Sequence, residues 1–306
     1  MDWLQEVADA LAQAQAIPCG PMRITPLWAD SLGAKSLAVR VETPDIRLLI
    51  DPGAAVMQKS FPLPEDEKER LKRFALERIA RAAEGCEAVF ISHYHHDHYA
   101  DPALFPRIYQ GKRLFIKDPN QWINRSQHGR ARAFLLALAG GAGLPEATPS
   151  PAAFPRPTFP LADAEDFGEY DPRRRALLRQ GLRRFKRLSR MWRSQPWVKE
   201  GRIGSADVRF ADGREFRFGR TAIRFSPPLF HGVEYARVGW VIACRVECEG
   251  KCFLFTSDVQ GPVIEDDRCW IIDQRPDLLI LDGPPTYLLG RILNRINLAR
   301  AERNLC

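Results

Sequence analysis

Four of the six histidines in this 306-residue chain lie within one short stretch, ISHYHHDHY, which runs from Ile91 to Tyr99. The imidazoles and the carboxylate of this stretch belong to His93, His95, His96, Asp97 and His98. Imidazole and carboxylate groups are the ligands that zinc, iron and manganese take in proteins. The stretch therefore predicts a transition-metal site.

The spacing of these side chains is compatible with more than one ion. A short turn can aim alternate residues into one hollow while the next pair faces a neighbouring hollow, so His93 and His95 would share one ion, and Asp97 and His98 a second. The apolar run before them, residues 88–92, is typical of a buried strand, so the ligands begin where that strand ends. The alternative is a histidine cluster on the surface without a ligand role.

The composition is that of a globular protein. With 45% apolar residues, the chain can bury a sizeable core as one large domain or as a domain with an insertion. No window approaches eighteen consecutive apolar residues, and the start Met-Asp-Trp has no basic leader, so we expect a cytoplasmic protein without a membrane partner. The seven cysteines include no Cys-x-x-Cys pair, which favours reduced thiols, although Cys248 and Cys252 flank a predicted hairpin turn and could pair.

The net charge of +7 is concentrated in one segment. Between Pro172 and Lys199 there are nine arginines, two lysines and no acidic residue. Apolar residues recur there at helical spacing and predict a helix over residues 173–193. The charge is either a solvated helical face or a surface that tracks a phosphate backbone, with Trp192 and Trp197 stacking on bases.

Strand and helix patterns alternate along the rest of the chain. Strand patterns occupy residues 23–28, 37–42, 46–50, 88–92, 114–116, 207–210, 215–218, 222–226, 238–246 and 252–255. Helical patterns occupy residues 65–84 and 121–139, after an accessory helix within residues 1–21. Asp212-Gly213 predicts a hairpin turn, and six prolines between residues 145 and 160 predict a loop.

The segment HYHHDH is an instance of His-x-His-x-Asp-His, and it resembles the metal-binding signature of the metallo-β-lactamase superfamily. The resemblance extends in chain order to residues 48–53, 226–231, 256–258 and 281–287. The whole set is most similar to a group of uncharacterised members, protein family 0282, and covers residues 22–306. It implies an α/β fold, the four-layer αββα sandwich, preceded by an extension over residues 1–21 and carrying a Pro- and Arg-rich insertion at about residues 140–205.

The resemblance also implies a set of site residues. The implied metal ligands are His93, His95, Asp97, His98, His231 and Asp258. Asp258 would bridge two ions, and Asp51 would lie beneath them and hydrogen-bond a ligand histidine or a bound water. The implied cofactor is zinc, as one or two ions, with manganese and iron as alternatives.

One ligand of the superfamily has no counterpart in this sequence. A last histidine is expected after a strand, matched here by residues 278–282, and a helix, matched by residues 288–304, yet no histidine follows His231. Three explanations stay open. The chain could lack its last strand, which we favour; it could be a one-metal variant; or Asp282 could serve as a substitute ligand.

The function that the resemblance implies is that of a metal-dependent hydrolase. A metal-bound hydroxide would attack a carbonyl or phosphoryl centre, while Asp97 or Asp51 orients the nucleophile or shuttles its proton. We expect a small-molecule ester or a phosphodiester as substrate. Two alternatives remain: a nuclease that binds nucleic acid through residues 173–193, and a metal-binding protein whose catalysis is impaired by the missing histidine.

Overall fold

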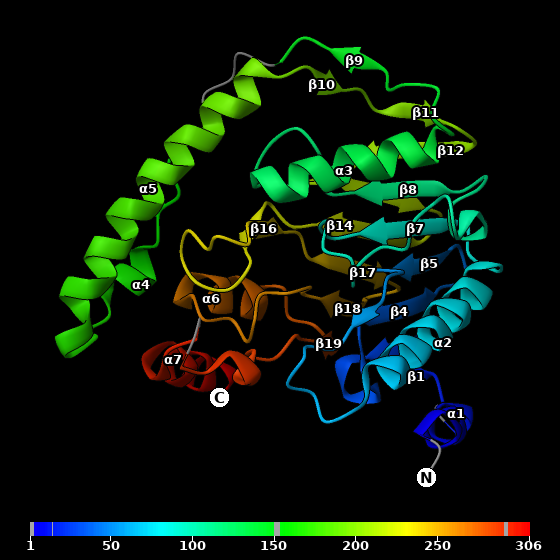
Figure 1. Cartoon of the computed structure of the whole chain (residues 1–306), viewed down its shortest axis with the longest axis horizontal. Coiled ribbons are helices and arrows are strands. Elements are labelled where there is room, and N and C mark those ends of the chain that lie inside the picture. The colour runs from blue at the N-terminus through cyan, green and yellow to red at the C-terminus, as the bar shows by residue number, and fades with distance from the viewer. Residues whose placement is uncertain (1–2, 14, 150–153, 291–292) are drawn as a thin grey trace.

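Two β-sheets lie at the centre of the computed structural model, which describes residues 3–13, 15–149, 154–290 and 293–306 (Figure 1). The first sheet has eight strands in the spatial order β1 (Ile17–Cys19), β2 (Met22–Ala29), β4 (Leu37–Glu42), β5 (Arg47–Ile50), β7 (Ala88–Ile91), β8 (Arg113–Ile116), β12 (Ala206–Phe210) and β11 (Gly201–Ile203). The second has five, in the order β13 (Glu215–Phe218), β14 (Thr221–Phe225), β17 (Cys244–Cys248), β18 (Lys251–Phe255) and β19 (Leu278–Ile280).

Strands at the centre of the first sheet are apolar on both faces. In β7, Ala88 and Phe90 belong to the core between the two sheets, whereas Val89 and Ile91 belong to the core beneath the outer helices. The ring of Phe90 meets that of Phe225, from β14, at a centroid distance of 4.7 Å. A strand buried on both faces reads as a continuous apolar run, which is why the sequence before the histidines is uninterrupted.

Helices cover the outer face of each sheet. Helix α2 (Glu65–Ala83) and helix α3 (Arg125–Leu138) pack on the eight-stranded sheet. On the five-stranded sheet, Ile271 of α6 (Glu265–Asp273) packs with Leu254, and α7 (Arg295–Leu305) lies against α6. The four layers confirm the predicted α/β αββα sandwich.

The remaining elements are short, apart from one long helix at the side of the molecule (Figure 1). They are α1 (Trp3–Gln13), β3 (Ala34–Lys35), β6 (Ala55–Val56), β9 (Glu146–Ala147), α4 (Pro160–Ala164), the long helix α5 (Asp171–Ser194), β10 (Trp197–Val198), β15 (Leu229–Phe230) and β16 (Trp240–Val241). Residues 140–205, the predicted insertion, thus contain α4 and α5. In the described part of the chain, no helix has the length and apolarity needed to cross a membrane.

Two predictions about turns are corrected by strand pairing. Asp212-Gly213 does not close a hairpin, because β12 pairs in parallel with β8 in the first sheet while β13 begins the second sheet. The turn instead carries the chain between sheets, and Asp212 accepts a hydrogen bond from the buried Lys117 ammonium. The hairpin after Cys248 is confirmed, but its register places Cys248 opposite Lys251 and not opposite Cys252. Both thiols are free.

Three element boundaries differ from the sequence patterns for local reasons. Helix α3 begins four residues later than predicted because the Asn124 side chain accepts a hydrogen bond from Gln127 N and caps the helix there. Asn294 caps α7 in the same way, so the helix predicted from residue 288 begins at Arg295. The strand predicted over 238–246 is divided into β16 and β17, which pair in different sheets.

The inner face of helix α5 makes one especially close backbone contact with the rest of the protein. Its inner face buries Phe185 and Trp192 among other aromatic rings, and Gly181 lies directly against Tyr235. A Cβ atom at Gly181 would lie 2.4 Å from Tyr235 Cβ. Glycine is therefore required here although it weakens a helix.

We expect Gly181→Ala to destabilise the protein, because neither the helix backbone nor the Tyr235 Cβ can retreat cheaply. As a matched control, Gly129→Ala lies within α3, where no atom is within 4 Å of the new Cβ. That control should gain about 0.5–1 kcal/mol from the better helix propensity of alanine. Urea unfolding measures both free energies, and a gain of stability in Gly181→Ala would contradict the packing described.

Candidate metal centre

The metal loop, residues 92–99, leaves the end of β7 and turns back on itself. The backbone of His98 donates to the carbonyl of His95 at 3.0 Å, so the loop forms a tight turn with His93, His95 and His98 pointing inward. The side chain of His96 is exposed. His93 and His95 belong to one group of converging ligand atoms, and Asp97 and His98 to another, as the spacing of the motif predicted.

The backbone of the metal loop packs directly against Gly53. A Cβ at this position would lie 2.2 Å from Tyr99 N and 2.6 Å from the His98 carbonyl carbon. These are backbone atoms, which cannot move without displacing the loop. Asp51-Pro52-Gly53 is therefore a support for the ligand loop and not an ordinary surface turn.

The first predicted ligand set comes together from three parts of the chain. His93 Nε2 lies 2.9 Å from His95 Nδ1. His231, which follows β15, and Asp258, which follows β18, complete a group in which one ligand atom from each of the four residues lies within 4.8 Å of every other. Among the described residues, neither ring nitrogen of the buried His231 makes a well-aligned hydrogen bond, although Nε2 lies 3.3 Å from Asp258 Oδ2. Buried polar atoms without a well-aligned partner are costly, so the ring nitrogen that carries the lone pair is suited to a ligand role.

The second predicted set shares Asp258 with the first. Asp97, His98 and Asp258 also bring their ligand atoms within 4.8 Å of one another. His98 Nε2 lies 3.1 Å from Asp258 Oδ2 and 3.9 Å from Asp97 Oδ2. The structure therefore gathers all six predicted ligands, with Asp258 in the shared position expected of a bridging carboxylate. That these six residues bind metal remains a prediction.

Asp51 lies beneath the cluster and is fully buried. Its Oδ1 accepts a hydrogen bond from Ser92 N at 2.7 Å, and its Oδ2 accepts from Ser92 Oγ at 2.6 Å and lies 2.8 Å from His98 Nδ1. The predicted hydrogen bond to a ligand histidine is present. Both oxygens of Asp51 are engaged inside the protein, and its suggested role toward the nucleophile stays a prediction. Asp51 positions His98 with Nε2 facing Asp258.

Two of the imidazoles are held neutral. Burial and the neighbouring imidazole groups lower the pKa of His93 well below its usual value. Burial and the charge of His231 lower the pKa of His95 to about 2. Neutral imidazole is the form whose nitrogen lone pair binds a metal ion.

The carboxylates of the centre outnumber its cationic groups. Although burial opposes protonation of His98, the carboxylates of Asp258 and Asp51 raise its pKa well above its usual value. Burial and the charges of Asp258 and Asp30 raise the pKa of Asp282 well above its usual value. Several buried acidic groups thus surround one imidazolium. Such an excess of negative charge favours the binding of an additional cation.

Sequence patterns missed two residues that contact the ligands. Gln127, on α3, accepts from Tyr94 N at 3.2 Å, and its Nε2 lies 3.5 Å from His95 Nε2. Ser257 has a left-handed backbone with φ of 55°, and its Oγ donates to Ser92 Oγ at 2.7 Å. No spacing pattern in the sequence identifies either residue, because the residues that they contact belong to distant segments of the chain.

Two further residues of ligand type lie outside the ligand groups. Within the described residues, Asp282 does not belong to either group of converging ligand atoms, so its role as a substitute ligand stays a prediction. His128 is half-buried on α3, and burial and the nearby Arg132 and Arg125 lower its pKa. It is not a member of the cluster.

Comparison with known proteins gives one family. The model of the metallo-β-lactamase superfamily matches residues 33–180. A UPF0282 protein of Methanopyrus kandleri is 34% identical over 296 residues, covering 93% of this chain and 79% of that protein. A UPF0282 protein of Korarchaeum cryptofilum is 34% identical over 285 residues, covering 93% of this chain and 74% of that protein.

Solved structures of low identity are similar as well. The metallo-β-lactamase fold protein YhfI from Bacillus subtilis matches with a TM-score of 0.35 and 14% identity, covering 77% of this chain and 61% of that one. Unliganded yeast PDE1 matches with a TM-score of 0.40 and 10% identity, covering 95% of this chain and 80% of that one. From its family relatives, the chain belongs to the uncharacterised protein family UPF0282, within the metallo-β-lactamase superfamily.

Proposed function

We propose that this protein is a metal-dependent hydrolase acting on an ester or a phosphodiester. The observation that supports it best is the convergence of His93, His95, His231 and Asp258, in which neither enclosed nitrogen of His231 makes a well-aligned hydrogen bond among the described residues. The superfamily to which the chain belongs is mostly hydrolytic, which agrees with this donor set.

Zinc suits the proposed centre best. His93, His95 and His231 offer imidazole nitrogens, and Asp258 offers an oxygen, a combination that zinc prefers and that manganese or iron can also accept. A bound divalent cation would supply Lewis acidity and would lower the pKa of a coordinated water enough to give hydroxide near neutral pH.

In this proposal, the residues around the centre have two different roles, the positioning of ligands and the orientation of water. Asp51 holds His98 in one orientation, and Ser92 Oγ, 3.1 Å from His93 Nδ1, does the same for the ring of His93. Asp97 is partly exposed and keeps its carboxylate at the edge of the cluster, where it can hold and orient an attacking water. Asp97 is thus the catalytic carboxylate of the proposal, and Asp51 is a positioning residue.

A metal-binding protein with impaired catalysis is the second candidate. One observation favours it: the group around His98 contains only three residues with one imidazole, whereas the first contains four residues with three. A protein that fills only the first group would bind a cation without assembling a two-metal centre.

Hydrolysis by the metal-loaded protein separates these candidates. We expect wild type with added zinc or manganese to cleave a bis-aryl phosphate or a generic aryl ester. Asp258→Ala should lower kcat/KM by a factor on the order of 100 or more, because it removes the carboxylate shared by both groups. His96→Ala, which alters an exposed histidine of the same loop, should behave as wild type. Equal loss in both variants, or no cleavage of any substrate by wild type, would contradict the hydrolase.

Asp51→Asn tests the support beneath the centre. The amide keeps the shape of the side chain but cannot accept at both of its ends, so His98 loses its fixed orientation. We expect metal affinity to fall by about 10–100-fold. Asp101→Asn is the matched control, since Asp101 is exposed close to the loop and its side chain accepts a hydrogen bond from the nearby Ala103 N. Competition with a chromogenic chelator measures both affinities, and equal values would exclude the positioning role.

A further inference from the structure

Helix α5 lies along one side of the molecule (Figure 1). Its exposed face presents a row of cations. We call this row the basic stripe. Its exposed members are Arg173, Arg175, Arg179, Arg183, Lys186, Arg187, Arg190 and Arg193. Spacings of three and four residues place most of them on one side of the helix, and from first to last they span about 30 Å at the rise of an α-helix.

The cations of the basic stripe make few contacts inside the protein: Arg190 Nε donates to the carbonyl of Lys186 on the same helix, and Arg193 lies over the ring of Phe154. In the described part of the chain none of them pairs with a carboxylate, whereas Arg174, on the inner face, lies 3.0 Å from Asp163 and 2.9 Å from Glu234. Like charges held in a row repel one another unless an anion lies between or across them. The positive charge of the basic stripe is therefore available to bind an anionic partner.

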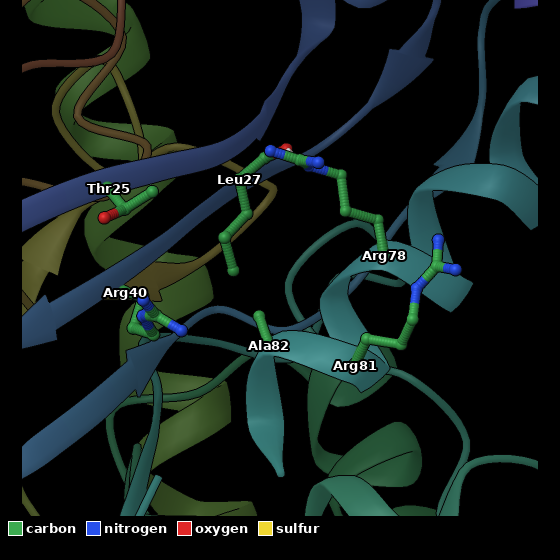
Figure 2. Close-up of a pocket in the computed structure, with 6 residues that line it drawn as sticks. All are labelled: Thr25, Leu27, Arg40, Arg78, Arg81 and Ala82. Atoms are coloured by element: carbon green, nitrogen blue, oxygen red, sulfur yellow. Dashed lines mark hydrogen bonds between the residues drawn. The ribbon is translucent and has the colours of Figure 1, made fainter. Parts of the chain in front are cut away.

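Another group of arginines shows the contrast. A hollow of about 360 Å³ between β2, β4 and α2 is lined by Arg40, Arg78 and Arg81 (Figure 2). There Arg40 lies 2.9 Å from Glu42, and Arg78 donates to the carbonyl of Leu27 at 3.2 Å. Arg40 of this group thus pairs with a carboxylate, which no cation of the basic stripe does among the described residues.

The chemistry of α5 fits a polyphosphate better than a membrane. An amphipathic helix that lies in a bilayer needs an exposed apolar face, but the apolar face of α5, with Phe185 and Trp192, is buried in the protein. A rigid row of guanidinium groups suits the regularly spaced phosphates of a nucleic acid. The expected stacking of bases on Trp192 is wrong, because this ring is 1% exposed and its Nε1 donates to Ile123 O. Contacts to phosphates alone would not select a sequence.

The loop of residues 232–239 connects the basic stripe to the metal centre. Arg184 of α5 donates to the Tyr235 carbonyl of this loop, which directly follows His231. On its other side the loop accepts a hydrogen bond from Gln127, the residue beside His95. Arg237 is exposed on the same loop, and its carbonyl accepts a hydrogen bond from the side chain of Asn124, the residue that caps α3, at 2.9 Å. Positive charge thus continues from α5 toward the centre.

We propose that the basic stripe binds the phosphate backbone of a nucleic acid and leads the strand over Arg237 to the metal centre. The second half of this inference rests on the proposed function, since the bound strand would be its substrate. The first half, binding, requires no catalysis.

Binding of a labelled 20-nucleotide strand, followed by fluorescence anisotropy in EDTA to prevent cleavage, tests the inference on the full-length protein. The stripe variant combines Arg183→Gln, Arg187→Gln and Arg190→Gln, and leaves out Arg184 because its bond to Tyr235 supports the fold. The control variant combines Arg23→Gln, Arg73→Gln and Arg81→Gln, three exposed arginines elsewhere. Both variants lose the same net charge.

We expect wild type and the control variant to bind with the same salt dependence. The stripe variant should lose roughly tenfold or more in affinity at low salt, and its slope of log K against log salt should be shallower by about 2, since three lost phosphate contacts count about 0.7 each on a single strand. Separate arms with RNA, DNA and duplex identify the preferred backbone.

Three results would overturn the inference: no binding to any nucleic acid at low salt, equal losses in the two variants, or binding only to anionic lipid vesicles or acidic polypeptides. Hydrolysis of a bis-aryl phosphate, which is too small to reach α5, is measured in parallel. Absence of strand binding by wild type, with this hydrolysis present, refutes the inference alone. Strand binding without any hydrolysis refutes the proposed function alone.

Discussion

One carboxylate oxygen organises the candidate centre. Oδ2 of Asp258 lies 3.1 Å from His98 Nε2, 3.3 Å from His231 Nε2 and 3.7 Å from His93 Nε2. These residues follow three different strands, β7, β15 and β18, so the contact exists only when both sheets are in place. Burying one carboxylate among imidazoles is unfavourable unless charges and hydrogen bonds compensate. The sandwich therefore holds together groups that a shared cation would stabilise.

The support of the centre extends one layer deeper. Asp51, with a left-handed backbone of φ 46°, orients His98 and the start of the metal loop, while Gly53 lets that loop pack against the chain. A non-glycine residue in this conformation is strained, and strain of this kind collects where the surrounding structure fixes a functional geometry. The same few residues thus serve fold and site together.

Local signals in the sequence were sufficient for much of this structure. The apolar run of β7 and the histidines after it predicted both the buried strand and the ligand loop, since side-chain periodicity and ligand spacing are properties of neighbouring residues. His231, Asp258 and Asp51 were assigned through resemblance and not through spacing. The structure places all three at the centre.

What the sequence could not predict depends on long-range contacts. Asp212-Gly213 has the composition of a hairpin, but β12 finds its partner in β8, about one hundred residues earlier, so the turn joins two sheets. Gln127 gave no signal because His95 lies on another element. The cations of α5 were evident from the sequence, but only the structure shows that Trp192 faces inward and that the loop after His231 lies between the helix and the centre.

Titration of the purified, chelator-treated protein with zinc, followed by calorimetry, tests the metal centre most directly. The arrangement of His93, His95, His231 and Asp258 predicts at least one tightly bound ion per chain and a higher unfolding temperature with metal, because a ligand that binds only the folded state stabilises it. His231→Ala should weaken this first binding event. Absence of binding by zinc, manganese and iron at micromolar concentrations, with an unchanged unfolding temperature, would show that the cluster is not a metal centre.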